Sequence, residues 1–469
     1  MSARIAIIGG GFCGTLAAVH LMRMHAGRGA ELHLVERSEA PGRGLAYAPG
    51  SERWLLNVPA GAMSALPGDD HHFLRYARSR GVAAAPGSFL PRPLYGDYLQ
   101  ALLRDAVAEK PSSVRFSAVC AEATDIRPLG DGAVRVVLHD GRSLEVDAVV
   151  LATGHATPAD PFPADGLVGE AGGLPAGNPR YVRNPWTPGA LDAVDRRRPV
   201  LLVGTGLTMY DVALELAAGG HRASLHAVSR HGLLPRPHAA AAPDAARSLP
   251  LPLWEGAPAP RRLLRDFRRR VAVSPGGDWR ALLASLRAET PALWAALPPS
   301  ERARFLRHLR PFWEVHRHRA APQVHAAVAE LAAAGRLRAG AGRLVAVEPR
   351  AGEVAVTVLR PGGGAEVLRV GCIVNCTGPG AGVAGIPLLA SLVRQGLATP
   401  DEHGLGLRTA PDYALVGRRG TPSRTLFYLG PLLRADHWES TAVPELRVHA
   451  ARLAARLSAA GEHAPALAA

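Results

Sequence analysis

The sequence predicts an α/β protein built from two similar parallel-sheet units, and three observations support this. Two segments, 4–14 and 200–211, each consist of a short apolar strand, a glycine-rich turn and the start of a helix. Each segment is followed later by an apolar strand that ends in Thr-Gly, at 148–154 and at 372–378. This order is typical of dinucleotide-binding folds, so we predict two Rossmann-like dinucleotide-binding domains.

The first unit carries the complete glycine pattern. Gly9 permits a tight turn, Gly11 lets a pyrophosphate approach the backbone, and Gly14 allows helix and strand to pack closely. The next strand, 31–35, ends at Glu36, 22 residues after Gly14, where a carboxylate accepts hydrogen bonds from a ribose. We therefore expect an FAD site here. The predicted FAD-binding residues of this unit are Gly9, Gly11, Phe12, Cys13, Gly14, Glu36, Arg37, Thr153 and Gly154.

The second unit departs from this pattern at two points. Met209 occupies the place of the third glycine, so looser packing between helix and strand is expected. The strand 224–228 ends in Ser229-Arg230 where the first unit has an acid, and a hydroxyl with a guanidinium suits a 2′-phosphate. NADPH is therefore predicted, with NADH as the alternative. The residues predicted to bind it are Gly204, Gly206, Asp211, Ser229, Arg230, Thr377 and Gly378.

Two dinucleotide sites in one chain imply that a nicotinamide hands a hydride to a flavin held between them. The C-terminal part adds a turn at Gly430 and a predicted helix over 442–457. Glu439 and Thr441 lie near the start of that helix, where backbone N–H groups are expected to face the pyrimidine edge of the flavin. We therefore include all three residues in the predicted FAD site.

The spacing of the two repeated units predicts that the second domain is inserted between two parts of the first. Counted from the first glycine to the final Thr-Gly, the second unit is 29 residues longer than the first. We assign the extra length to a helical insertion at about 236–322, with helix-like runs at 279–286 and 302–309. The predicted domains are an FAD-binding domain over 1–160, an NAD(P)H-binding domain over 161–369, and a return to the FAD-binding domain over 370–469.

The amino-acid composition argues against several classes of function. The 54 Lys and Arg residues outnumber the 40 Asp and Glu, but the arginines are scattered and aromatic residues make up only 5%. Nucleic-acid binders concentrate charge and use aromatic residues for stacking, so no nucleic-acid partner is expected. Four cysteines without framework spacing favour a reducing cytoplasm. No signal peptide or membrane span is expected either.

Several further motifs occur in order along the chain. They are the turn 9–14, the stretches 43–47, 56–61, 91–98, 184–186, 204–209, 313–319 and 375–378, and Trp-Glu-Ser-Thr-Ala at 438–442. With these motifs the chain resembles, over nearly its whole length, the bacterial FAD/NAD(P)-binding group that includes FAD-dependent urate hydroxylases and L-aspartate N-monooxygenases. The resemblance implies that a flavin reduced by NAD(P)H reacts with dioxygen to a hydroperoxide, which hydroxylates a small polar, nitrogen-containing substrate.

Candidate catalytic and substrate-binding residues lie in predicted loops and in one helix-like motif. Asn57 precedes Pro59 in an irregular stretch and is a candidate both for catalysis and for binding the flavin or nicotinamide. His316, with His318 as the alternative, is a candidate proton shuttle. Arg92 with Tyr95 suits an anionic or imide-like substrate. No histidine set has the spacing of metal ligands, so no metal is expected.

Two other functions remain open at this level. One is an FAD-containing NAD(P)H dehydrogenase or reductase that delivers electrons elsewhere without oxygenation. Disulfide reduction is disfavoured because Cys372 and Cys376 read as buried strand residues rather than a redox pair. The other alternative is a non-catalytic nucleotide-sensing module.

Overall fold

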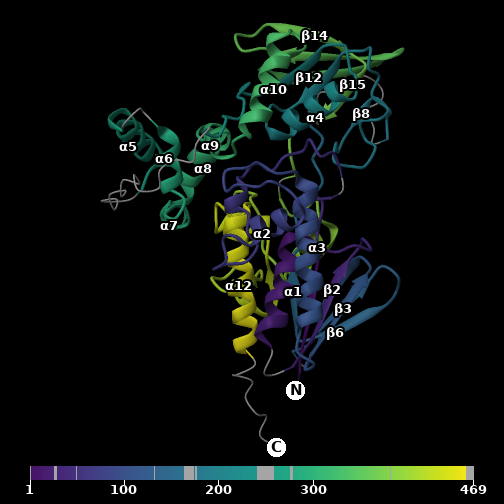
Figure 1. Cartoon of the computed structure of the whole chain (residues 1–469), viewed down its shortest axis with the longest axis vertical. Coiled ribbons are helices and arrows are strands. Elements are labelled where there is room, and N and C mark those ends of the chain that lie inside the picture. The colour runs from purple at the N-terminus through teal and green to yellow at the C-terminus, as the bar shows by residue number, and fades with distance from the viewer. Residues whose placement is uncertain are drawn as a thin grey trace, which may run out of the picture.

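The computed structural model describes residues 2–25, 29–48, 50–130, 132–162, 174, 177–239, 258–274, 278–380 and 382–460. It contains two sheet-based domains and a group of helices beside them (Figure 1). This confirms the predicted α/β fold with two Rossmann-like domains. None of the helices in these ranges is both long and apolar enough to cross a membrane.

The first domain is a six-stranded sheet covered by helices. Strand β1 pairs in parallel with β2 on one side and β7 on the other, and residues from both ends of the chain share one hydrophobic core. Helix α1 packs against both α3 and α12, which explains why nearly all of it is buried. The sheet order is β16 (Ala414–Val416), β17 (Pro422–Tyr428), β7 (Ala148–Leu151), β1 (Ala3–Ile8), β2 (Ala30–Glu36) and β3 (Val114–Cys120). The helices are α1 (Phe12–Met24), α2 (His72–Ser79), α3 (Arg92–Glu109), α11 (Pro387–Arg394) and α12 (Val443–Ala460).

The second domain repeats this plan with a five-stranded sheet. Its central strand β9 pairs in parallel with β10 and with β15, and α4 and α10 pack together on it. The sheet order is β11 (Leu337–Ala341), β10 (Leu225–Ser229), β9 (Val200–Val203), β15 (Cys372–Asn375) and β8 (Tyr181–Val182), with α4 at Leu207–Ala218 and α10 at Pro322–Ala333.

Strand β15 corrects the predicted domain boundary at 370. Cys372 pairs with Val200 and Asn375 with Val203, so this strand belongs to the second domain. The return to the first domain follows it, where β17 pairs with β7. Each domain also carries a three-stranded antiparallel sheet. These strands are β4 (Ala123–Pro128), β5 (Val134–Leu138), β6 (Ser143–Val146), β12 (Arg343–Arg350), β13 (Glu353–Leu359) and β14 (Ala365–Val370).

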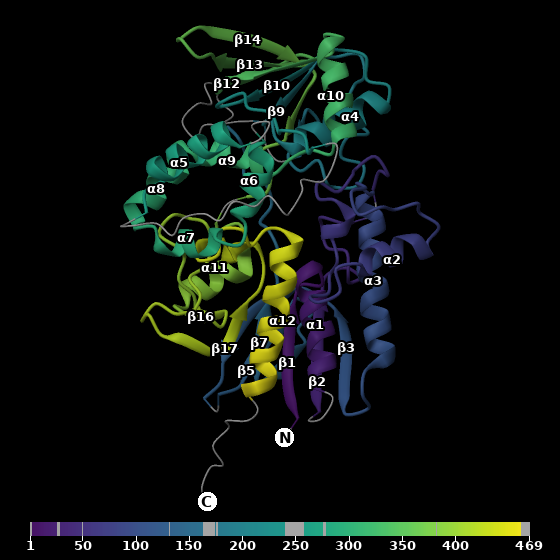
Figure 2. The ribbon, with the colours of Figure 1, turned by 60° about the vertical axis from the view of Figure 1, so that its left-hand side comes forward.

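The described residues of the predicted insertion are mostly helical, and Figure 2 shows the insertion beside the junction of the two domains. Trp294 anchors it to the first domain, because its ring stacks on Trp438 at 4.5 Å and its indole N–H donates to the carbonyl of Ala435 at 2.8 Å. The insertion helices are α5 (Pro260–Val273), α6 (Trp279–Ser285), α7 (Thr290–Ala296), α8 (Pro299–His308) and α9 (Arg310–Arg317). Residues 240–257 and 275–277 of the predicted insertion lie outside the described part.

Candidate active site

A cavity of about 1950 Å³ lies where the two domains and the helical insertion meet. Its wall includes the first glycine-rich turn, the start of α4 and the end of α9. The predicted site residues that line it are Gly9, Gly11, Phe12, Cys13, Glu36, Arg37, Asn57, Arg92, Thr153, Gly154, Asp211 and Thr441. Residues predicted from distant segments therefore share one wall.

The first glycine-rich turn has the shape that a bound pyrophosphate requires. Gly9 has a φ of +104°, and a Cβ there would lie 2.4 Å from the carbonyl oxygen of Ala152. A Cβ on Gly14 would lie 1.8 Å from the carbonyl oxygen of Gly9, so only glycine lets α1 start this close to β1. Gly11 caps α1, and the first turn of α1 carries no acidic residue. The helix N-terminus therefore offers N–H groups and positive potential to a phosphate.

Glu36 is held at the end of β2 by the turn itself. Its carboxylate accepts from the backbone N–H of Gly10 at 2.6 Å and from that of Ser38 at 3.1 Å. Each carboxylate oxygen can accept a further hydrogen bond. The residues around the first turn thus fit an adenine dinucleotide, with Glu36 lining the cavity where a ribose hydroxyl would donate.

The second turn repeats the first glycine but not the third. Gly204 has a φ of +110°, and a Cβ there would lie 2.4 Å from the carbonyl oxygen of Cys376. Met209 is fully buried in the second core, so the helix is packed although the third glycine is missing. Gly204 and Gly206 themselves do not line the large cavity, whereas the adjoining Leu207 does.

The predicted 2′-phosphate residues lie at the end of β10. The Ser229 hydroxyl lies 2.8 Å from the hydroxyl of Thr205 and accepts from the backbone N–H of Gly232 at 3.0 Å. Arg230 is exposed and follows directly. Neither residue lines the large cavity, nor do Thr377 and Gly378. Their roles toward NADPH therefore remain predictions.

Asp211 and Arg92 contact each other across the domain junction. The Arg92 guanidinium donates to Asp211 at 2.7 Å and to the carbonyl of Leu55 at 3.2 Å, and it lies 5.1 Å from the centre of the Trp186 ring. Burial raises the pKa of Asp211, and the positive charge of Arg92 opposes this rise. The sequence predicts that Asp211 binds the cofactor and that Arg92 binds the substrate, but the structure joins them in one ion pair on the cavity wall.

Tyr95 and His316 are corrected by the structure. Tyr95 is fully buried in an aromatic cluster with Tyr47 and Phe73 and does not line the cavity, so it is not a substrate residue. The His316 ring contacts the carbonyl oxygen of Phe312 at 2.7 Å and also does not line the cavity. The alternative candidate, His318, does line it.

Glu439 and Gly430 do not line the cavity, but each contacts or adjoins a residue that does. Glu439 is 4% exposed and pairs with Arg317 at 2.7 Å. Gly430 has a φ of +147° and precedes a short 3₁₀ helix, whose first residue, Pro431, lines the cavity. The predicted helix near residue 442 begins at Val443. Arg317 occupies the carboxylate of Glu439, and the expected contact of the flavin with backbone N–H groups of this segment stays a prediction.

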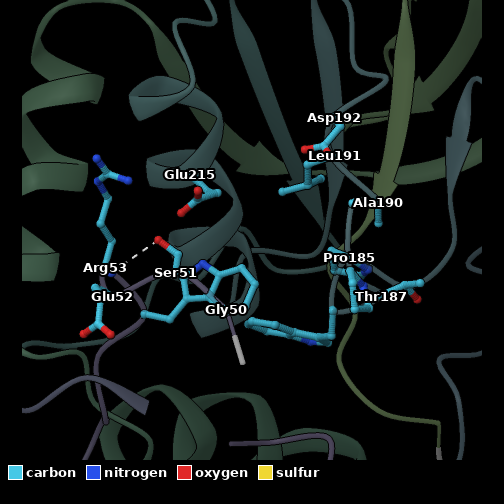
Figure 3. A pocket seen from close by; sticks show the side chains of 14 residues that line it. Gly50, Ser51, Glu52, Arg53, Pro185, Thr187, Ala190, Leu191, Asp192 and Glu215 are labelled. Carbon is cyan, nitrogen blue, oxygen red and sulfur yellow. Dashed lines mark hydrogen bonds between the residues drawn. The ribbon is translucent and has the colours of Figure 1, made fainter. Parts of the chain in front are cut away.

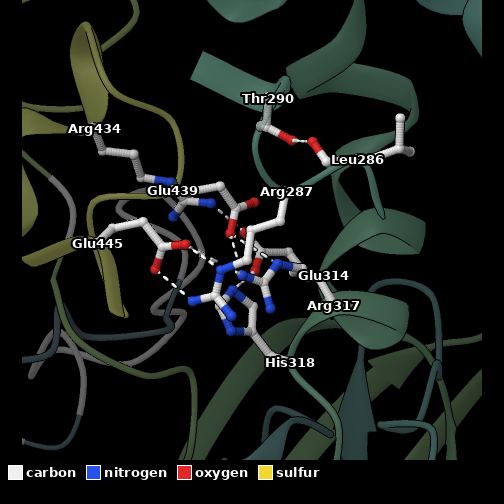
Figure 4. Close-up of polar contacts among 9 residues, drawn as sticks. All are labelled: Leu286, Arg287, Thr290, Glu314, Arg317, His318, Arg434, Glu439 and Glu445. Carbon is white, nitrogen blue, oxygen red and sulfur yellow. Dashed lines mark hydrogen bonds and ion pairs between the residues drawn. The ribbon is translucent and has the colours of Figure 1, made fainter. Parts of the chain in front are cut away.

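A network of charged residues joins the insertion to the C-terminal segment (Figure 4). Arg287 pairs with Glu445, and Glu314 accepts from Arg434 at 2.5 Å and lies 3.0 Å from His318. Burial alone would raise the pKa of Glu314, but His318 and Arg434 hold it well below its ordinary value. The network orients three of its members, Arg287, Arg317 and His318, on the cavity wall.

Arg319 adds a cation that the described residues do not pair with a carboxylate within salt-bridge distance. It lines the cavity, and its pKa is lowered to about 10 by burial and by the nearby Arg317 and Arg280. The sequence did not predict Arg287 and Arg319 as site residues. Arg319 lies in the motif at 313–319, which could have indicated it as a site residue. No motif in the sequence points to Arg287.

Two neutral histidines complete the wall. Burial and the nearby Arg319 lower the pKa of His238 to about 4, and its Nε2 lies 2.9 Å from the carbonyl oxygen of Asn57. This distance fits an Nε2–H that donates to Asn57, which fixes the tautomer. Burial and Arg434 likewise lower the pKa of His155 to about 4. Both rings are therefore uncharged at neutral pH.

The four cysteines are free and do not form a redox pair. Cys13 lines the cavity, but burial raises the pKa of its thiol to about 12. Cys372 and Cys376 are buried in the core of the second domain, as predicted, and burial raises the pKa of both. Thiolate chemistry of these three buried cysteines at neutral pH is thus disfavoured.

Comparison with known proteins agrees with this architecture. A family described as FAD-NAD(P)-binding matches residues 6–156. Nitrosuccinic acid synthase from Aspergillus oryzae is 26% identical over 236 residues, a match that covers 46% of this chain but only 36% of that protein.

Solved structures match almost the whole chain. An L-lysine 6-monooxygenase from Pseudomonas syringae has a TM-score of 0.66 at 20% identity and covers 98% of this chain and 100% of its own. An ornithine N-hydroxylase from Kutzneria sp. 744 has a TM-score of 0.63 at 15% identity, with coverage of 98% and 100%. The chain therefore has the two-domain FAD/NAD(P)-binding flavoprotein fold, and its residues 6–156 match the FAD-NAD(P)-binding family.

Proposed function

We propose that this protein is an FAD-dependent, NAD(P)H-consuming monooxygenase that hydroxylates a small polar, nitrogen-containing substrate. The observation that carries the proposal is the large cavity, which reaches from the first glycine-rich turn past the start of α4 to a cationic wall at Arg317 and Arg319. Structural relatives named as ornithine, lysine and cadaverine monooxygenases support the same class.

The turn from Gly9 to Gly14, Glu36 and the segment Thr153-Gly154 would hold FAD. Reduced by NAD(P)H and supplied with dioxygen, FAD provides the two electrons with which one oxygen atom goes to the substrate and the other leaves as water. The protein's own part is to bind, orient and shield the reactants.

The cationic wall supports a substrate with a carboxylate. Arg319 lines the cavity, and the carboxylates of Glu439 and Glu445 already neutralise the neighbouring Arg317 and Arg287. A substrate carboxylate on Arg319 would gain a charge-assisted hydrogen bond in a partly desolvated site. An amino acid with an acidic group meets both requirements, because it carries a nitrogen to oxidise and an anion to bind.

The two uncharged histidines would form hydrogen bonds near the substrate nitrogen. His238 is oriented by Asn57 and is uncharged at neutral pH, so its other ring nitrogen can accept a hydrogen bond from the substrate. Asn57 therefore acts in this proposal mainly through its backbone carbonyl, which holds the ring. His318, paired with Glu314, is the second candidate group.

NADPH is the proposed electron donor. The absence of an acid at the end of β10 and the presence of exposed Arg230 support a 2′-phosphate there. The four free cysteines support a reducing cytoplasm as the working compartment. Small molecules and dioxygen are the proposed partners.

Coupled product analysis tests the proposal. The purified protein, loaded with FAD, is supplied with NADPH in air and a panel of amino acids, amines and urate. The expected result is NADPH oxidation that rises with an acidic amino acid and yields its N-hydroxylated product. NADPH oxidation with hydrogen peroxide and no hydroxylated product across the panel would instead identify a reductase or oxidase.

A further inference from the structure

Backbone hydrogen bonds join the insertion helix α9 to the chain that follows β10. The N–H of Arg236 donates to the carbonyl of Val315 at 3.0 Å, and the N–H of Ala320 donates to the carbonyl of Arg236 at 2.9 Å. Figure 1 shows α9 on the side of the insertion that faces the second domain. The helix is therefore held beside the end of β10, where Arg230 is proposed to contact the 2′-phosphate of NADPH.

Hydrogen bonds also hold the loop 229–233 at the end of β10. The Thr205 hydroxyl donates to the carbonyl of Leu233 at 2.6 Å, and the Ser229 hydroxyl lies 2.8 Å from that of Thr205. Arg230 follows Ser229 and is exposed. In a Rossmann-type domain the ribose of the adenosine lies at this strand end, and an arginine accommodates its 2′-phosphate. The loop therefore presents Arg230 from a well-defined backbone.

Two side chains of α9 lie next to this loop. The ring of Phe312 lies 6.4 Å from the ring of His231, and Phe312 is 48% exposed. An exposed aromatic ring beside a ribose site is a surface on which a nucleotide base can stack. Arg310 is the first residue of α9 and is close enough to Arg230 for their positive charges to interact. The loop and the start of α9 thus form one surface with aromatic rings and two guanidinium groups.

The positive charge of Arg310 is only partly balanced by the residues around it. Its Nε lies 3.4 Å from Glu314, and the structure gives its terminal amino groups no hydrogen bond with any described residue. Glu314 also accepts from Arg434 at 2.5 Å and lies 3.0 Å from His318. Burial, together with the positive charges of Arg434 and Arg230, lowers the pKa of this guanidinium, although Glu314 opposes the change. The local excess of cations favours a bound anion.

A smaller cavity beside α4 does not suit a phosphate. It has a volume of about 720 Å³ and is lined by the acidic residues Glu52, Asp192 and Glu215, with Arg53 as the one cation among its described lining residues (Figure 3). Carboxylates repel a phosphate, which binds to guanidinium and N–H groups instead. Of these two surfaces, charge therefore favours the one formed by the loop 229–233 and α9.

We propose that the insertion forms part of the NADPH site, in which Arg310 binds the 2′-phosphate together with Arg230, and Phe312 stacks on the adenine. This inference rests on the NADPH dependence of the proposed function. The nucleotide then contacts both the second domain and the insertion. Because Glu314 contacts both Arg310 and His318, the nucleotide end of α9 is also connected to the wall of the large cavity. The insertion therefore contributes to the choice of NADPH over NADH.

The probe is adenosine 2′,5′-bisphosphate, titrated by calorimetry into the full chain at neutral pH, with adenosine 5′-monophosphate as the ligand that lacks the 2′-phosphate. We expect the wild-type protein to bind the bisphosphate more tightly. Arg310→Gln should weaken the bisphosphate about tenfold and leave the monophosphate nearly unchanged, because it removes a charge-assisted contact with the 2′-phosphate alone. Arg304→Gln is the matched control, since Arg304 also belongs to the insertion, pairs with Glu301 and is 71% exposed.

Phe312→Ala provides an independent variant with a different expected signature. It should weaken both ligands by the same factor, about fivefold or more, because both contain adenine. It decides the question if thermal unfolding shows that Arg310→Gln does not fold.

Two outcomes would overturn the proposal, and they can be told apart. If Arg230→Ala loses the preference for the bisphosphate while Arg310→Gln and Phe312→Ala bind like the control, the insertion takes no part and the NADPH site of the proposed function stands. Equal affinity of the wild-type protein for the two ligands, or no saturable binding of either, would remove both.

Discussion

The ion pair between Arg92 and Asp211 joins the two domains, and its contribution to the free energy of unfolding can be measured. Replacing Arg92 with Met removes the guanidinium that donates to Asp211 at 2.7 Å and to Leu55 at 3.2 Å. Asp211, 6% exposed, is then left as a buried carboxylate without its cation. We expect the free energy of unfolding to fall by about 3–5 kcal/mol at neutral pH, the usual cost of breaking a buried pair from one side.

The loss of stability should depend on pH in a defined direction. Burial raises the pKa of Asp211, and removing Arg92 raises it further because the guanidinium opposes that rise. A carboxyl whose pKa is raised by folding stabilises the folded state below its unfolded pKa, and that contribution is lost as the pH rises through the folded pKa. The difference between R92M and the wild-type protein is therefore largest at neutral pH and shrinks toward acid pH.

Urea unfolding followed by tryptophan fluorescence, at neutral and at mildly acidic pH, measures both quantities. The matched control is Arg4→Met, because Arg4 pairs with Asp147 at the same 2.7 Å but with side chains 41% and 47% exposed. An exposed pair contributes at most about 1 kcal/mol. The reasoning is refuted if R92M costs no more than R4M, or if its cost is the same at both pH values.

Three further predictions concern the cofactor and substrate groups. Gly14→Ala should abolish FAD retention, since its Cβ would lie 1.8 Å from a carbonyl oxygen, whereas Gly130→Ala, with open space around it, should keep the bound flavin spectrum. Arg230→Ala should raise the Michaelis constant for NADPH by about tenfold or more and leave that for NADH nearly unchanged, and equal effects on both would discard the 2′-phosphate contact. Arg319→Gln should raise the Michaelis constant for an acidic substrate about tenfold or more while sparing its neutral amide analogue, and parallel losses in steady-state assays of both would contradict a carboxylate contact.

Local sequence determined the two nucleotide units because their requirements are local. Gly9 and Gly204 need positive φ values and an absent side chain beside a neighbouring strand, and both conditions follow from a tight strand-to-helix turn. The buried strands and the glycine spacing therefore predicted both domains. The boundary at 370 failed because the sheet to which strand β15 belongs depends on pairing with β9, which the apolar pattern of the strand does not encode.

The tertiary structure alone decided which polar side chains meet. Arg92 and Tyr95 lie close together at the start of α3, yet one reaches Asp211 on the cavity wall and the other is buried in the core. His316 and His318 are two residues apart, and only the second lines the cavity.

The physical reason is that a side chain's surroundings come from elements far away in the chain. Arg92 and Asp211 are 119 residues apart, and Arg317 meets Glu439 across 122 residues. The amino-acid pattern determined the backbone turns that can receive two dinucleotides, because those turns depend on neighbours in sequence. Charge pairing and desolvation depend on neighbours in space, so the folded chain decided which arginines are neutralised and which face the cavity.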